Sequence, residues 1–188
     1  MRTLADLGEF GLIERLVRLA ARGPRARAVV LGIGDDAAIL RPRGGEDVVL
    51  TTDAFVEQVH FRLDQESARM AGRRALAANL SDLAAMGARP LGFTTALAAP
   101  SRTPLRMVLD LARGLVDLAL AHQAPWVGGN VTRAGEISLS IAALGAVDRG
   151  RALRRDGARV GDRILVTGTL GGAALARARG RVRRAPVP

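Results

Sequence analysis

ESARMAGRRALAANLSDLAAMGARPLGFTTALAA, residues 66–99, places a long helical pattern directly before a strand pattern. Apolar residues recur at helical spacing over 66–86, which predicts an amphipathic helix. Gly87 and Pro90 are typical of a helix end, and the apolar run 91–99 is typical of a strand. This segment therefore predicts a helix that leads at once into a strand.

On both sides of this segment, helix and strand patterns alternate along the chain. The middle helix is expected to carry Arg73 and Arg74 on its water-facing side. The predicted helices are 9–21, 66–86 and 104–122, and the predicted strands are 28–33, 36–41 (or a loop), 48–52, 91–99, 136–147 and 163–168, with a strand end and turn at 126–132. Helices spaced between strands, several of them hairpin-like neighbours, favour an α+β fold with a mixed or antiparallel sheet.

Composition narrows the class of protein. A length of 188 residues suits one large domain, or one domain plus part of a second. Hydrophobic residues make up 48% of the chain but include only four Phe and one Trp, so an aliphatic core is expected. The absence of cysteine excludes thiol catalysis and Cys-ligated zinc. Because no apolar run could span a bilayer and the N-terminus lacks a secretory pattern, we expect a cytoplasmic location.

The formal net charge of +10 does not by itself indicate nucleic-acid binding. All 28 basic residues are arginine, and five of them lie in residues 173–188, which contain no acid. Proteins that follow a phosphate backbone usually add aromatic stacking platforms or a recognisable module, and neither occurs here. A dedicated nucleic-acid function and a membrane role are therefore not expected.

Four aspartates lie in apolar or glycine-rich surroundings, where a carboxylate loses hydration: Asp35, Asp36, Asp53 and Asp82. That loss is tolerated when a cation or metal accompanies the carboxylate. The flanking Gly, Thr, Ser and Asn residues supply oxygen ligands and permit close approach, which suits magnesium and phosphate. The lysine-containing phosphate loop of P-loop enzymes is missing. The pattern favours a magnesium–nucleotide site of another type.

Seven ordered strings resemble the thiamine-monophosphate kinase family: GEFGLIERL, GIGDDAAIL, TTDAFVEQVHF, ANLSDLAAMGARP, GGNVTR, RALRRDGARVGD and LVTGTLGG. The wider superfamily includes aminoimidazole ribonucleotide synthetase, whose N-terminal domain has this kind of fold. The resemblance implies an α+β domain with helices on one face of its sheet, which dimerises through that sheet. It also implies in-line transfer of the ATP γ-phosphate to thiamine monophosphate, with Mg²⁺ as cofactor and with ATP and thiamine monophosphate as partners.

The resemblance also implies roles for individual residues. The magnesium ligands would be Asp36, Thr51, Thr52, Asp53, Asp82 and Asn130, and the nucleotide contacts would be Gly129, Asn130 and Arg154. His60 would contact the thiamine phosphate substrate. Position 130 is often aspartate in the family, so the asparagine here is expected to lower affinity for that metal ion because it lacks the negative charge.

Simpler interpretations of these residues stand beside the functional ones. Asp35 could only shape a turn, Asp82 could be an N-cap or pair with Arg74 or Arg89, and Arg154 could be one solvated arginine among several. The expected domain division is 1–148 for nucleotide binding and dimerisation, 149–172 for a connector and the start of a second domain, and 173–188 for a disordered tail. Two other functions remain possible: a superfamily relative that uses ATP on another small substrate, and an inactive Mg-ATP-binding dimerisation module.

Overall fold

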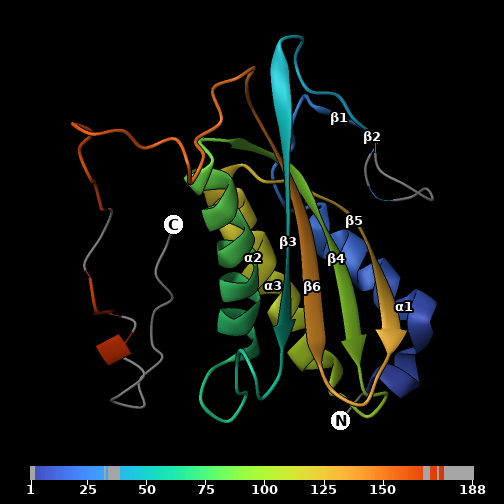
Figure 1. Ribbon diagram of the computed structural model, residues 1–188. Helices are drawn as coiled ribbons and strands as arrows, with labels where there is room; N and C mark the ends of the chain where they lie inside the picture. Colours follow the sequence, from blue (N-terminus) through green and yellow to red (C-terminus); the bar gives the residue numbers. More distant parts are fainter. Residues whose placement is uncertain (1–2, 32, 34–38, 167–169, 173, 176–188) are drawn as a thin grey trace.

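The structure is a computed structural model that describes residues 3–31, 33, 39–166, 170–172 and 174–175. Three helices and six strands are present in these residues (Figure 1). In chain order they are α1 (Leu4–Ala20), β1 (Val29–Leu31), β2 (Ile39–Leu40), β3 (Glu46–Val56), α2 (Ala68–Ala85), β4 (Arg89–Ala99), α3 (Leu105–His122), β5 (Trp126–Arg133) and β6 (Ser138–Asp148).

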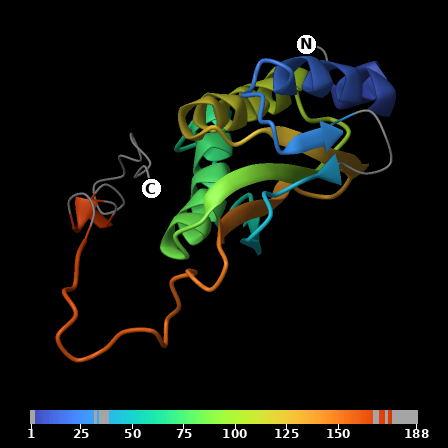
Figure 2. The same cartoon turned by 90° about the horizontal axis from the view of Figure 1, so that it is seen from above.

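The main sheet has the strand order β3-β6-β4-β5. The β3–β6 and β4–β6 pairs are antiparallel and β4–β5 is parallel, which makes the sheet mixed, while β1 and β2 form a separate two-stranded ribbon. The three helices lie on one face of the main sheet (Figures 1 and 2). The predicted α+β class with a mixed sheet is confirmed.

The core lies between the main sheet and helices α2 and α3. Its fully buried side chains are mostly aliphatic. Among the largest fully buried side chains of the described residues, only Phe93 on β4 is aromatic. Inward and outward side chains alternate along β6, as they do on a sheet with one covered face. The aliphatic core expected from the composition is therefore present. Among the described residues, no helix combines the length and the apolar character needed to cross a membrane.

Two glycines let helices α2 and α3 approach closely. A Cβ atom added at Gly72 on α2 would lie 2.0 Å from the carbonyl oxygen of Leu111 on α3. A Cβ atom added at Gly114 on α3 would lie 1.9 Å from the carbonyl oxygen of Arg69 on α2. Any larger residue would force the two backbones apart, so the crossing depends on glycine at both positions.

Helix α1, strand β5 and the described part of the segment 163–168 differ from the sequence prediction. Helix α1 begins at Leu4 rather than at residue 9, because the Asp6 carboxylate accepts hydrogen bonds from the Thr3 backbone N–H (2.8 Å) and hydroxyl (3.0 Å), and the helix is kinked at Gly8. The segment predicted as a strand end and turn is a full strand, β5, because it pairs along β4.

The strand predicted at 163–168 is wrong over its described part, residues 163–166. No strand of the described chain lies beside it, and Ile164 and Leu165 are 95% and 86% exposed. An extended segment with no partner strand leaves its backbone groups in water and gains nothing from strand geometry.

An ion pair fixes the start of β3. Arg89 Nη2 donates to both carboxylate oxygens of Glu46 at 2.7 Å, and the Arg43 N–H donates to Oε2 at 2.8 Å. The Arg89 hydrogen bond holds the pKa of Glu46 below its usual value of 4.5. Since the folded-state pKa is lowered, this pair stabilises the fold above the unfolded-state pKa, and the effect is lost as pH falls through the folded-state pKa.

We therefore expect Glu46→Gln to lower the free energy of unfolding near neutral pH and to have a smaller effect under acidic conditions. Urea unfolding of both proteins at about pH 7 and about pH 3.5 measures the difference. Glu14→Gln, in an exposed pair on α1, is the control and should change little at either pH. A loss for Glu46→Gln that is equal at both pH values would contradict this account.

Candidate functional site

Two of the predicted metal ligands meet where β3 passes helix α2. Thr51 Oγ1 donates a hydrogen bond to Asp82 Oδ2 at 2.6 Å. Thr51 lies on the helix-covered face of β3 together with Val49 and Phe55, which pack against the core. Asp82 lies on α2 between buried Leu80 and Leu83 but is itself exposed. A hydroxyl and a carboxylate from separate elements thus lie side by side at the surface.

The other two predicted ligands of this strand lie on opposite faces. Asp53 follows Thr51 by two residues and therefore shares its face of the sheet. Thr52 points to the other face and donates through Oγ1 to the carbonyl oxygen of Ile141 at 3.0 Å. Within one chain, Asp53 thus shares the face of the sheet on which the Thr51–Asp82 pair lies, and Thr52 does not.

Asp82 does not have the simpler roles that the sequence left open. It lies in the last turns of α2, whose N-cap is Ser67. Arg74 pairs with Glu66, and Arg89 pairs with Glu46. Both arginines that could have neutralised Asp82 therefore pair with other carboxylates, and the Asp82 carboxylate can bind a cation.

His60 lies in the turn that follows β3. Its Nδ1 accepts a hydrogen bond from the Val56 N–H at 3.1 Å, and its ring stacks on Phe55 with centroids 5.6 Å apart. Arg74 on α2 donates through Nη2 to the His60 carbonyl oxygen at 3.2 Å. The imidazole is exposed, and its backbone and ring contacts limit how it can turn.

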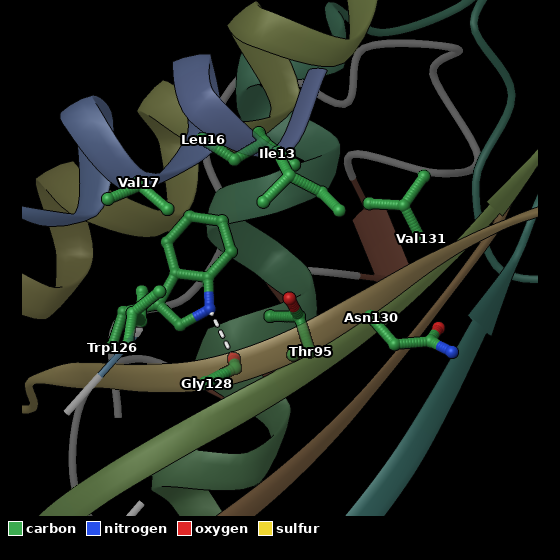
Figure 3. Close-up of a pocket in the computed structure, with 10 residues that line it drawn as sticks. Ile13, Leu16, Val17, Thr95, Trp126, Gly128, Asn130 and Val131 are labelled. Atoms are coloured by element: carbon green, nitrogen blue, oxygen red, sulfur yellow. Dashed lines mark hydrogen bonds between the residues drawn. The ribbon is translucent and has the colours of Figure 1, made fainter. Parts of the chain in front are cut away.

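Gly129 and Asn130 lie on edge strand β5. A Cβ atom at Gly129 would lie 2.3 Å from the Thr95 carbonyl oxygen, so β5 can pass β4 here only with glycine. The two residues border a 50 Å³ cavity between β5 and α1, floored by Trp126, whose Nε1 donates to the Gly128 carbonyl oxygen at 2.8 Å (Figure 3). Figure 3 shows the Asn130 amide directed away from Trp126.

Asn130 is far from the Thr51–Asp82 pair within one chain. It aligns with Ala96, which aligns through Ser140 with Ala54 on the open face of β3. Three strand spacings separate β5 from β3, which is about 14 Å. The predicted metal ligands that the structure describes therefore do not form one cluster in the single chain, and no group of three His, Cys, Asp or Glu side chains suited to a metal occurs among those residues.

The remaining predicted residues divide into two groups. Arg154 is exposed and donates two hydrogen bonds to Asp156, at 2.9 and 2.8 Å. Among the described residues, Asp156 is the only side chain with which Arg154 pairs. Asp35 and Asp36 lie outside the described residues.

Two residues near His60 were not predicted correctly from the sequence. Glu66 was overlooked, and Arg74 was expected to face water, but it contacts the His60 turn and its side chain is only 24% exposed. No local signal marked Glu66, because the stretch before α2 (RLDQES, 62–67) is polar throughout apart from Leu63.

The chemistry of the Thr51–Asp82 surface fits magnesium. Magnesium prefers oxygen ligands and commonly takes one or two carboxylates, with water and phosphate oxygens completing the coordination. One hydroxyl and two carboxylates, from Thr51, Asp82 and Asp53, meet that requirement without a closed cage of protein ligands. The arrangement can hold a cation that is shared with a phosphorylated ligand.

Known proteins resemble this chain in both sequence and fold. Residues 34–147 match the family described as AIR synthase related protein, N-terminal domain. A thiamine-monophosphate kinase of Synechococcus elongatus is 42% identical over 170 residues, which is 90% of this chain and 50% of that protein. The chain thus spans about half the length of the curated relatives it matches.

Two solved structures carry the comparison further. The crystal structure of thiamine-monophosphate kinase from Stenotrophomonas maltophilia K279a has a TM-score of 0.76 and 44% identity, covering 93% of this chain and 54% of the other. A second structure, described as AaThiL complexed with AMPPCP and TMP, has a TM-score of 0.67 and 30% identity, covering 99% of this chain and 57% of the other.

Proposed function

This chain belongs to the family described as AIR synthase related protein, N-terminal domain. From that premise we propose that it is the magnesium- and ATP-binding part of a thiamine-monophosphate kinase. The proposed reaction transfers the γ-phosphoryl group of ATP to thiamine monophosphate and yields thiamine diphosphate. The observation that carries the proposal is the Thr51–Asp82 hydrogen bond, which joins two expected metal ligands 31 residues apart in sequence. The solved relative described with AMPPCP and TMP supports the choice of substrates.

Thr51, Asp53 and Asp82 are the residues that would hold magnesium. When bound, the ion supplies charge neutralisation at the phosphate oxygens of ATP. The protein contributes position: β3 fixes Thr51 and Asp53, and α2 fixes Asp82. Asp36 lies outside the described residues and stays a predicted ligand. Thr52 also stays a prediction, but its side chain faces the other side of the sheet from Thr51, so within one chain it would not reach the same ion.

The other proposed contacts are to the organic substrates. His60 would donate a hydrogen bond to the phosphate of thiamine monophosphate. Gly129, which has no side chain, would allow nucleotide phosphates to approach the β5 backbone, and the Asn130 amide would bind at its exposed rim. Arg154 would leave its exposed pair with Asp156 to neutralise ATP phosphates, which costs little because such surface pairs are weak.

A second candidate function is Mg-ATP binding without phosphoryl transfer. It is favoured by the positions of Asn130 and Thr52, which lie apart from the Thr51–Asp82 pair within one chain. Incubation with Mg-ATP and thiamine monophosphate, followed by chromatography for thiamine diphosphate, separates the two. Product formation supports the kinase, and ATP binding without product supports the binding module. A panel of other small phosphate acceptors tests the superfamily-relative alternative.

We also propose that the chain forms a homodimer through the open face of its sheet. This face carries small and apolar side chains that the helices do not cover: Val48, Leu50, Ala54, Ala96, Ala142 and Leu144. Val48 and Leu50 are 51% and 67% exposed. An apolar sheet face of this kind is characteristic of an interaction surface.

The cytoplasmic location expected from the sequence stays a prediction.

Ala142→Arg should convert the dimer to a monomer. Ala142 lies on the central strand β6, aligned with Thr52 and Thr94, so a long cation there would stand in the middle of the proposed interface. Sedimentation velocity measures the mass of the native and variant proteins. Ala121→Arg, on the exposed side of α3, is the matched control and should stay dimeric. A native protein that sediments as a monomer, or a dimeric Ala142→Arg variant, contradicts the proposed interface.

A further inference from the structure

Glu66 is a buried carboxylate that the proposed chemistry does not use. Its side chain is only 3% exposed, although it lies in the loop before α2. One carboxylate oxygen, Oε1, accepts a hydrogen bond from Arg74 Nη1, and Oε2 has no partner among the described residues. Burial raises the pKa of Glu66, against the opposing attraction of Arg74. A buried, half-satisfied carboxylate is costly to keep and calls for a role.

Arg74 connects that carboxylate to the turn that carries His60. Besides its pair with Glu66, its Nη2 donates to the His60 carbonyl oxygen at 3.2 Å. Its guanidinium carbon also lies 5.3 Å from the centre of the Phe55 ring. The Phe55 ring in turn stacks with two rings of this turn, His60 and Phe61, with centroids 5.6 and 5.5 Å apart. The guanidinium therefore fixes both the backbone of the turn and the ring against which the imidazole rests.

The contacts of His60 determine which of its nitrogens carries a proton. Its Nδ1 accepts a hydrogen bond from the Val56 N–H, so Nδ1 has no proton in this arrangement. A neutral imidazole must then carry its proton on Nε2. The nitrogen that is not tied to the backbone is consequently the donor, and it is free to meet a phosphate oxygen.

We propose that Glu66 and Arg74 are a positioning pair that holds the 56–61 turn so that His60 presents its Nε2–H to the phosphate of the substrate. The proposal rests on the proposed function for the identity of that phosphate, but not for the state of the imidazole. Arg74 acts through the turn, since its described contacts are the Glu66 carboxylate, the His60 carbonyl oxygen and the Phe55 ring.

The test is nitrogen NMR of the His60 ring combined with calorimetric titration of thiamine monophosphate, in native protein and in Arg74→Met. In the native protein the ring shifts should report a single Nε2–H tautomer. In Arg74→Met they should move to a mixture of tautomers, and affinity for thiamine monophosphate should fall about tenfold, the size typical of losing an outer orienting group. Arg69→Met, on the same helix and in an exposed pair with Asp117, is the matched control and should change neither measurement.

Further outcomes decide the proposal. Arg74→Lys keeps the charge but loses the planar fork, so it should fold and still show the mixed tautomers if Arg74→Met is unstable. Unchanged His60 shifts in both variants would overturn the proposal, and so would altered shifts with unchanged affinity. If the native protein does not bind thiamine monophosphate, the proposed function fails, while the tautomer measurement still decides whether the pair positions His60.

Discussion

Alanine at position 82 should abolish magnesium-dependent ATP binding. Asp82 presents an exposed carboxylate beside the Thr51 hydroxyl, and no arginine of the described chain neutralises it. Truncating one partner of a charge pair that is desolvated in the complex typically costs about 2–5 kcal/mol, so we expect a loss of affinity of about thirtyfold or more. Isothermal calorimetry with ATP and magnesium measures it. The fold should be unaffected, since the side chain is exposed.

A matched aspartate controls this experiment. Asp110 lies on α3 in an exposed pair with Arg113, away from β3, so Asp110→Ala should bind Mg-ATP like the native protein. Affinity in Asp82→Ala that equals that of Asp110→Ala would remove Asp82 from the site. In the presence of EDTA the native protein and Asp82→Ala should bind ATP equally weakly, because only the metal-dependent part depends on this carboxylate.

Gly114→Ala should be the most destabilising single-methyl substitution among those considered for this fold. The added Cβ atom would lie 1.9 Å from the Arg69 carbonyl oxygen and 2.9 Å from the Arg73 backbone nitrogen, and neither backbone group can rotate away. Helices α2 and α3 would have to separate and disturb the core between them. Alanine is the better helix former by about 1 kcal/mol, yet we expect a net loss of about 3 kcal/mol.

Chemical denaturation measures the free energy of unfolding of this variant. Gly44→Ala is the control, because a Cβ atom at Gly44 meets nothing within 4 Å, and it should lie within about 0.5 kcal/mol of the native value. A Gly114→Ala protein that is as stable as the native one would mean that the helices do not cross as closely as described here. Helical far-ultraviolet dichroism of the folded variant would show whether α3 itself persists.

Much of the fold could be predicted from local patterns. The helix and strand within residues 66–99 were predicted within a few residues, because Gly87 and Pro90 mark the end of a strongly periodic helix. Aspartates in apolar surroundings indicated a cation site, and two of the predicted ligands, Thr51 and Asp82, are in hydrogen-bond contact. Local signals were sufficient for the helix and strand themselves, whereas the role of Thr51 was implied by the family resemblance.

What could not be predicted depends on contacts between distant residues. The strands lie in the order β3-β6-β4-β5, which places Asn130 on the far edge from Thr51, and no local pattern encodes that order. In the sequence, Gly72 and Gly114 are two glycines that lower helix propensity, and the close crossing of α2 and α3 explains why glycine is needed at both positions. Arg74 had the spacing of a water-facing residue, but its guanidinium pairs with the buried Glu66 carboxylate and lies over the Phe55 ring.

The surface formed by β3 and α2 is proposed to bind a metal–nucleotide complex, and a paramagnetic metal tests this directly. Manganese can replace magnesium with ATP, and as a paramagnetic ion it broadens the NMR signals of the nuclei nearest to it. We expect Mn-ATP to broaden the backbone signals of Thr51, Asp53 and Asp82 first, and Mn²⁺ with ATP to act at far lower concentration than Mn²⁺ alone. Broadening that begins elsewhere, with these three signals unchanged, would contradict the proposed site.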